Sequence, residues 1–69
     1  MEGNYINTKV GLKSLRENKG LTIEEVALKI GVNPRVVSEF EINPSYIEMK
    51  NAVLLSGLYN VAMDAVNWH

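Results

Sequence analysis

Apolar residues recur at helical spacing along most of this 69-residue chain. Leu12 and Leu15 lie three residues apart, and a second stripe with the spacing of one helix face consists of Ile23, Val26, Ala27 and Ile30. No stretch alternates apolar and polar residues in the way that is typical of a half-buried strand. The pattern predicts an all-α fold in which residues 1–69 form a single domain, because a chain of this length has room for one small core.

The segment from Thr22 onward contains clear helix boundaries. Thr22 and Glu25 have the spacing of a capping box, in which each side chain bonds the backbone amide of the other residue at a helix start. Gly31 predicts the end of that helix, and Asn33 followed by Pro34 predicts the N-cap and the first position of the next helix. Two short helices joined by so tight a turn are typical of a helix-turn-helix unit, whose second helix fits the major groove of DNA.

Three further helices are expected around this unit, which makes five in all. The first is predicted over residues 8–19, with Thr8 as its N-cap. The fourth is predicted over residues 45–59 and opens on a second capping box that begins at Ser45. A short fifth helix over residues 63–68 closes the domain.

The predicted third helix has an inner and an outer face. At 100° per residue, Val36, Val37 and Phe40 fall on one side, and we expect them in the core. The other side is the one that a partner would contact, and it carries Pro34, Arg35, Ser38 and Glu39.

A series of short motifs lies at regular spacing between residues 10 and 66. Residues 12–22 read LKSLRENKGLT, and the later motifs are Glu24-Glu25-Val26-Ala27, Ile30-Gly31-Val32, Val37-Ser38, Phe40-Glu41 and Tyr59-Asn60-Val61. In this order, and without a gap, the series resembles the lambda-repressor-like (Cro/XRE-type) helix-turn-helix family. The resemblance implies a five-helix DNA-binding domain that acts in transcription regulation.

The resemblance also implies roles for individual residues. Arg16 and Glu41 match an ion pair that ties the first helix to the end of the third. Arg35 would present its guanidinium group to a guanine, and Glu39 would accept a hydrogen bond from a cytosine amino group. The implied base contacts are Pro34, Arg35, Ser38 and Glu39, and the implied contacts to the DNA backbone are Lys13, Arg16 and Asn33.

Charge is distributed unevenly along the chain. Residues 1–35 carry six basic and four acidic residues, whereas residues 36–69 carry one basic and four acidic residues. The sequence pI is about 5.7, while DNA-binding domains usually have a pI above about 9. Ile23 stands where relatives often place a glutamine that reaches the DNA backbone, and the loop after the third helix has no positive charge. We therefore expect weak binding by one copy and tighter binding by a homodimer.

The predicted fourth helix is apolar on two sides. One side carries Met49, Ala52, Val53 and Ser56, and Leu54 lies roughly opposite. So small a chain has little of its own to cover a second apolar side. We therefore expect a subunit or partner interface that contains Ile47, Leu54, Leu58, Val66 and Trp68.

Several chemistries lack the residues they need. The chain has no cysteine and one histidine, His69, so we expect neither a disulfide nor a bound metal. We find no nucleophile–base arrangement and no glycine-rich phosphate loop, so we expect neither an enzyme nor a cofactor. The longest apolar run covers residues 52–55, and no signal sequence precedes it, so we expect a cytoplasmic protein that does not bind membranes.

Two functional hypotheses follow. In the first, the protein is a phage or bacterial repressor-like regulator that binds double-stranded operator DNA as a homodimer. In the second, it is an antirepressor or modulator that keeps the fold but binds another repressor protein in place of DNA. The motif series favours the first hypothesis, whereas Ile23, the uncharged loop and the acidic second half favour the second.

Overall fold

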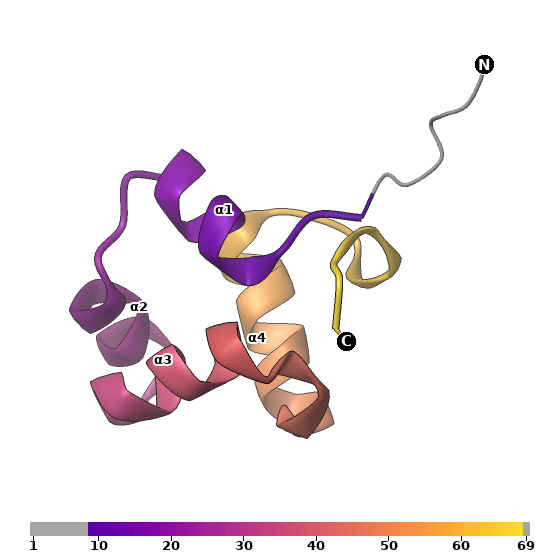
Figure 1. Cartoon of the computed structure of the whole chain (residues 1–69). Coiled ribbons are helices and arrows are strands. Elements are labelled where there is room, and N and C mark those ends of the chain that lie inside the picture. Colours follow the sequence, from indigo (N-terminus) through magenta and orange to yellow (C-terminus); the bar gives the residue numbers. More distant parts are fainter. Residues whose placement is uncertain (1–8, 69) are drawn as a thin grey trace, which may run out of the picture.

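The computed structural model describes residues 9–68. Within this range four α-helices and two 3-10 helices pack around one core. In chain order they are α1 (Leu12–Asn18), α2 (Ile23–Ile30), α3 (Pro34–Ile42), η2 (Pro44–Tyr46), α4 (Met49–Tyr59) and η3 (Met63–Ala65). Figure 1 shows α2 and α3 at one end of the molecule, with α1 above them and α4 behind, while both ends of the described chain lie on the opposite side. The all-α class is confirmed, with four α-helices in this range where the sequence predicted five.

Local signals form α2 and the start of α3 as predicted. The Glu25 amide donates a hydrogen bond to Thr22 Oγ1 at 3.1 Å, and the Thr22 amide donates to Glu25 Oε1 at 2.8 Å, which completes the capping box. Gly31 ends α2 with a φ of 76°, in the left-handed region that favours glycine. α3 begins directly after Asn33, whose Oδ1 accepts a hydrogen bond from the Arg35 amide at 2.8 Å. These boundaries are therefore confirmed.

Replacing Thr22 by alanine is expected to lower the free energy of unfolding by about 1 kcal/mol, because one amide at the start of α2 loses its partner. Urea denaturation followed by circular dichroism measures the change. Glu24→Ala is the matched control, since Glu24 is an exposed neighbour that takes no part in the capping box. Equal losses from the two variants would contradict a specific capping role for Thr22.

The first helix is shorter than predicted. It begins at Leu12 with Gly11 as its N-cap, so the prediction of an N-cap at Thr8 is wrong, and Thr8 itself lies outside the described residues. Val10 instead forms an isolated parallel bridge with Val66. The Val10 amide donates to the Ala65 carbonyl at 3.1 Å, and the Val10 carbonyl accepts from the Asn67 amide at 2.9 Å. Extended backbone at Val10 is incompatible with a helix that starts earlier.

The segment between α3 and α4 also differs from the prediction. Pro44 is the first residue of η2, which is one turn of 3-10 helix. The Ile47 amide donates to the Pro44 carbonyl at 3.1 Å and closes this turn. Ile47 is then extended, and α4 starts after Glu48 without a side-chain cap. The second capping box predicted at Ser45 is therefore wrong. The residue before a proline is biased away from helical backbone, and Asn43 has a φ of −130° and a ψ of 73°.

The chain after α4 forms η3 and then an extended segment, so the predicted fifth α-helix over residues 63–68 is wrong. Val66 has extended backbone and is 1% exposed. Trp68 Nε1 donates a hydrogen bond to the Met63 carbonyl at 2.8 Å, which ties the end of this segment to its start. The bridge to Val10 accounts for the difference, because it requires extended backbone at Val66.

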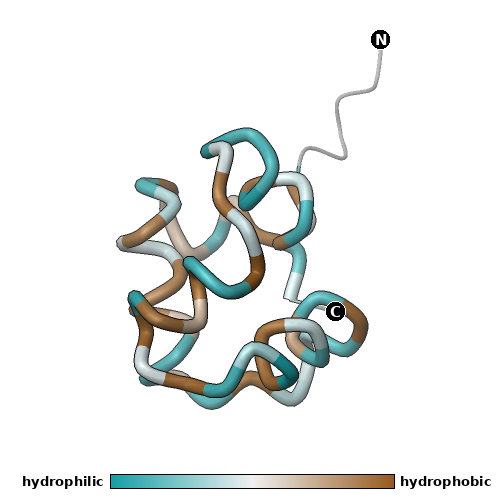
Figure 2. The backbone as a smooth tube through the Cα atoms, turned by 90° about the vertical axis from the view of Figure 1, so that its left-hand side faces the viewer, coloured by the Kyte–Doolittle hydropathy of each residue, from teal (hydrophilic) through white to brown (hydrophobic). Residues whose placement is uncertain are grey.

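The core lies between the four helices and the C-terminal segment. Figure 2 shows hydrophobic and hydrophilic stretches alternating along the helices, as expected where each helix has one buried side. Val37 is 1% exposed, as predicted, while Val36 and Phe40 are half-buried. The main cluster contains Leu12, Val26, Ala27, Ile30, Val37, Leu55, Tyr59 and Val66.

Candidate nucleic-acid interface

The turn between α2 and α3 holds the two helices as a rigid pair. The amides of Gly31 and Val32 both donate to the Ala27 carbonyl, at 2.8 and 3.0 Å. Ala27 is 2% exposed, and Val32 is half-buried against the core. A small side chain at Ala27 permits the close approach of α3, so this pair presents one fixed side of α3 to solvent.

The outer side of α3 is open. Pro34, Arg35 and Glu39 are exposed, and Ser38 is half-buried. Within residues 9–68 the Arg35 side chain makes no hydrogen bond or ion pair, so its planar set of five N–H donors is free to bind an external acceptor. Asn33 uses Oδ1 to cap α3, which leaves its side-chain NH₂ group available as a donor.

Arg16 connects α1 to the end of α3. Its Nε donates to Glu41 Oε2 at 2.7 Å, its Nη2 donates to Glu41 Oε1 at 3.3 Å, and its Nη1 donates to the Leu21 carbonyl at 3.0 Å. Arg16 is 9% exposed, and its hydrogen bonds with Glu41 raise the pKa of its guanidinium above the ordinary value. The pair implied by the family resemblance is thus present. Because these bonds engage the guanidinium group, they favour a structural role for Arg16 over a contact with the DNA backbone.

Tyr59 lies in the electrostatic field of this ion pair. Burial and, to a smaller extent, the nearby Glu41 carboxylate raise the pKa of Tyr59 to about 12, although Arg16 opposes the change. Tyr59 is 3% exposed. Its phenol therefore stays neutral at physiological pH and belongs to the core.

A pocket of about 280 Å³ lies where α1, α2 and α3 meet. Its lining combines three of the predicted DNA contacts, Lys13, Arg16 and Ser38, with Ile23 of α2 and with Glu41 and Ile42 of α3. Arg35, Pro34 and Glu39 lie outside this pocket. The structure therefore divides the predicted contacts between an exposed edge at the start of α3 and a mixed polar and apolar notch beside α1.

One residue of the outer side escaped the sequence reasoning. Ile42 is 74% exposed and also lines the notch beside α1. It lies four residues after Ser38 and seven after Arg35, so the same 100° rule that placed those residues puts Ile42 on their side of α3. The signal was thus available from the sequence.

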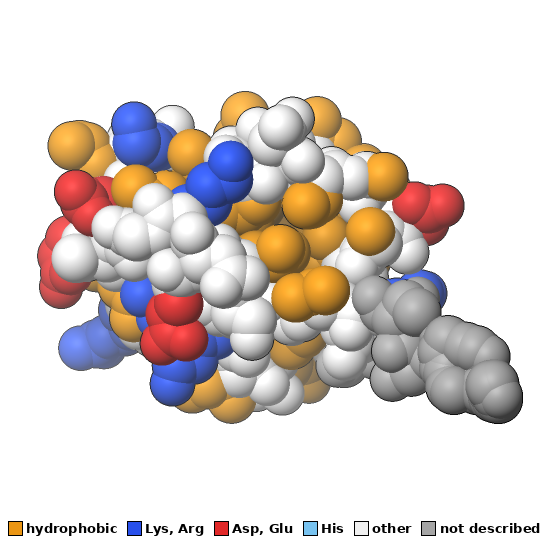
Figure 3. Space-filling view, turned by 90° about the horizontal axis from the view of Figure 1, so that it is seen from above, with side chains coloured by type: hydrophobic (Ala, Val, Ile, Leu, Met, Phe, Trp, Pro, Cys, Tyr) orange, Lys and Arg blue, Asp and Glu red, His pale blue; other side chains and the backbone are white. Residues whose placement is uncertain are grey.

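The charges around α1 and α2 are mixed. Figure 3 views the molecule from the side of α1, where basic and acidic side chains lie near one another at one end and hydrophobic side chains gather in the middle of the face. A continuous basic surface is not visible on this face. On this face, any binding to phosphates must therefore depend on individual cations placed near carboxylates.

The predicted partner interface is partly wrong. Val66 is buried in the core because it pairs with Val10, and Ile47, Leu58 and Trp68 are half-buried against the same core. Leu54 is 46% exposed, as an interface residue requires. The sequence reasoning also missed two exposed residues of α4, Met49 and Val53.

Residues 9–68 lack two features that would indicate other kinds of function. None of the helices in this range has the length and hydropathy needed to span a bilayer. Residues 9–68 also contain no group of three or more side chains suited to hold a metal ion.

The order of the helices and the tight turn after α2 agree with a comparison to known families. A family model described as helix-turn-helix matches residues 12–66, a range that includes all four α-helices. No curated protein and no solved structure matches the chain significantly. The chain therefore belongs to the lambda-repressor-like (Cro/XRE-type) helix-turn-helix family of DNA-binding regulators.

Proposed function

We propose that this protein regulates transcription by binding a specific double-stranded DNA sequence through the outer side of α3, with two copies on neighbouring half-sites. The observation that carries the proposal is the exposed guanidinium group of Arg35 in the first turn of α3, which has no partner among residues 9–68. In helix-turn-helix proteins the residues at the start of the second helix of the unit contact the base edges.

The chemistry of the outer side suits the major groove. Arg35 has the geometry to donate two hydrogen bonds to O6 and N7 of a guanine. Glu39 lies one turn further along α3 and is exposed, so it is placed to accept a hydrogen bond from a cytosine amino group. Ser38 and Pro34 lie next to these residues on the outer side of α3 and would complete the surface that reads the bases.

Contacts to the DNA backbone complete the proposed interface. Lys13 is exposed on α1, beside the notch that also contains Ser38. The free side-chain NH₂ group of Asn33 is a second donor for a phosphate. Arg16 supports both groups indirectly, because its ion pair with Glu41 fixes α1 relative to α3.

Replacing Arg35 by alanine is expected to weaken binding to the preferred DNA sequence by about 10- to 100-fold, since one bidentate base contact contributes about 1–3 kcal/mol of discrimination. The preferred sequence is first selected from random duplexes with the wild-type protein. Fluorescence anisotropy at two salt concentrations then measures the affinities for that sequence and for a scrambled duplex.

Arg35→Lys is the matched control for this experiment. It keeps the positive charge but loses the planar fork, so it should retain salt-dependent binding to the scrambled duplex while losing most of the sequence preference. The proposal fails if Arg35→Ala leaves the affinity for the selected sequence unchanged, or if the wild-type protein selects no sequence.

A second function is favoured by Ile42 and Ile23. Ile42 is 74% exposed on the side of α3 that faces a partner, and Ile23 lines the adjacent notch. Such a surface suits a modulator that binds another repressor protein. A stable complex with a helix-turn-helix repressor in size-exclusion chromatography, abolished by Ile42→Glu and not by Arg35→Ala, would support this function over DNA binding.

A further inference from the structure

The exposed side of α4 is apolar. Met49 is 69% exposed, Val53 is 53% exposed and Leu54 is 46% exposed. The opposite side of α4 is buried and consists of Ala52, Leu55, Ser56 and Tyr59. The helix thus has a core side and a second apolar side that no other described residue covers.

Gly57 lies near the C-terminal end of this exposed side, and the fold does not require a glycine there. It belongs to α4 and does not adopt the positive φ found at Gly20 and Gly31. A Cβ atom added to Gly57 would meet nothing within 4 Å. A glycine inside a helix lowers the folding equilibrium constant by about fivefold relative to alanine. Its presence leaves a position without a side chain on the exposed surface of α4, one turn after Val53.

The spacing of these residues is symmetric about Val53. Met49, Val53 and Gly57 follow one another at intervals of four residues, so they form a single ridge along α4. In an antiparallel pair of such helices that cross at Val53, Met49 of each copy lies opposite Gly57 of the other. In both of these contacts, the large Met49 side chain of one copy packs where Gly57 of the other copy has no side chain. Such a surface is complementary to itself, as a two-fold interface requires.

We propose that this surface, the α4 ridge of Met49, Val53 and Gly57, is the homodimer interface, with two copies packed antiparallel about a two-fold axis at Val53. Its role in placing two copies on DNA rests on the proposed function, whereas the dimer itself does not.

Charge also fits a second copy. Lys50 and Glu48 lie at the N-terminal end of α4 with exposed side chains 3.9 Å apart. The last turn of α4 has no basic residue. Antiparallel packing brings Lys50 of one copy toward the C-terminal end of the other α4, where the negative end of the helix dipole attracts a cation.

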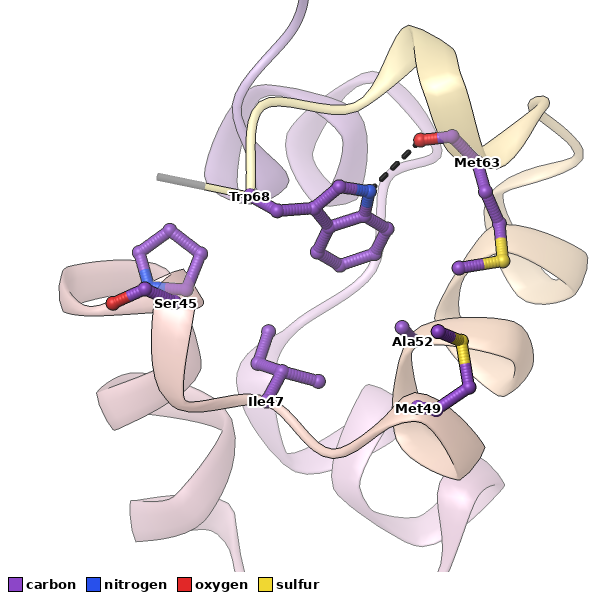
Figure 4. Close-up of a pocket in the computed structure, with 7 residues that line it drawn as sticks. Ser45, Ile47, Met49, Ala52, Met63 and Trp68 are labelled. Carbon is purple, nitrogen blue, oxygen red and sulfur yellow. Dashed lines mark hydrogen bonds between the residues drawn. The ribbon is translucent and has the colours of Figure 1, made fainter.

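The apolar surface continues beyond the α4 ridge into a pocket of about 270 Å³. Figure 4 shows the Trp68 indole and Ile47 on one side of this pocket, with the side chains of Met49 and Met63 on the other. An 11-residue helix is only about 16 Å long, and a stable interface buries about 800 Å² on each partner. The ridge therefore gives a weak dimer, which adjacent DNA half-sites would strengthen by raising the local concentration.

Disulfide crosslinking tests the register directly, because the chain contains no cysteine. Val53→Cys is expected to crosslink to itself on oxidation. Met49→Cys mixed with Gly57→Cys is expected to give the mixed dimer, while Met49→Cys alone is not. Two copies of residue 49 would be about 12 Å apart along the helix axes, beyond the span of about 7 Å that a disulfide bridges. Leu28→Cys, at a position on α2 that is 84% exposed, is the control for random collision.

A second variant separates the interface from the stability of the monomer. Gly57→Ala is expected to raise the folding equilibrium constant by about two- to fivefold and to fill the space that Met49 of the other copy would occupy. It should therefore weaken cooperative binding to two half-sites without changing the affinity for a single half-site. A gain in stability with unchanged cooperativity would overturn the proposed interface.

The remaining outcomes separate this inference from the proposed function. Crosslinking at Leu28→Cys as fast as at Val53→Cys, or a dimer in sedimentation analysis that lacks the Met49–Gly57 crosslink, would overturn the α4 ridge. Specific binding to a half-site by a strictly monomeric protein would do the same and leave the proposed function intact. A dimer with the predicted crosslinks that selects no DNA sequence would support the ridge and reject the proposed function.

Discussion

Glu41→Ala is expected to lower the free energy of unfolding by about 3–5 kcal/mol, because it leaves the Arg16 guanidinium buried without its carboxylate partner. Both side chains of this ion pair are mostly buried, with exposed fractions of 11% and 9%. Small domains have a total stability of about 5–15 kcal/mol. The variant should therefore be largely unfolded in mild urea, as measured by circular dichroism.

Two further variants show whether the unpaired charge is the cause. Glu39→Ala removes an exposed carboxylate from the same helix and should change stability by less than about 0.5 kcal/mol. Replacing both partners, as in Arg16→Met with Glu41→Leu, should restore most of the lost stability, because a buried ion pair exchanged for apolar groups is often nearly neutral. A Glu41→Ala protein as stable as the Glu39→Ala protein would contradict the structural role of the pair.

Leu55→Ala is expected to lower the free energy of unfolding by about 2–5 kcal/mol. Leu55 is 1% exposed and is among the largest fully buried side chains of the described chain. Its truncation removes buried apolar surface and leaves a cavity that α4 is unable to close without losing other contacts. Urea denaturation in dilute solution measures the loss.

The adjacent residue provides the control for this prediction. Leu54 has the same side chain on the same helix but is 46% exposed, so Leu54→Ala should cost less than about 1 kcal/mol. Similar losses from the two variants would mean that the core does not lie on the Leu55 side of α4.

Signals carried by residues close in sequence predicted much of this fold. The capping box at Thr22, the glycine at position 31 and the Asn33-Pro34 start of α3 each act within a few residues, and the structure contains all of them. The outer side of α3 followed from the same local rule, because a helix rotates by a fixed angle per residue.

Contacts between distant residues account for what the sequence did not predict. The bridge from Val10 to Val66 joins segments at the two ends of the described chain, and it prevents helix formation at both places. Neither segment contains a local signal for this pairing. It also explains why Val66 is in the core and not on the predicted interface.

For the fourth helix, the sequence did not predict which side is buried. Its apolar residues surround the helix on two sides, so periodicity alone did not decide which side faces the core. Tertiary packing selected Ala52, Leu55, Ser56 and Tyr59 and left Met49 and Val53 in solvent. The exposed Gly57 on that second side is the feature from which we inferred a dimer interface.

The position of Trp68 has a practical consequence. Trp68 is the chain's single tryptophan, and its half-buried indole donates a hydrogen bond to the Met63 carbonyl. Its fluorescence emission should therefore shift to longer wavelength when the C-terminal segment detaches, while the helical signal of α1 to α4 is still intact. Because Val66 pairs with Val10, this intrinsic probe should also report release of the segment around Val10. Trp68 fluorescence therefore measures local unfolding of the segments around Val10 and Val66 without an added label.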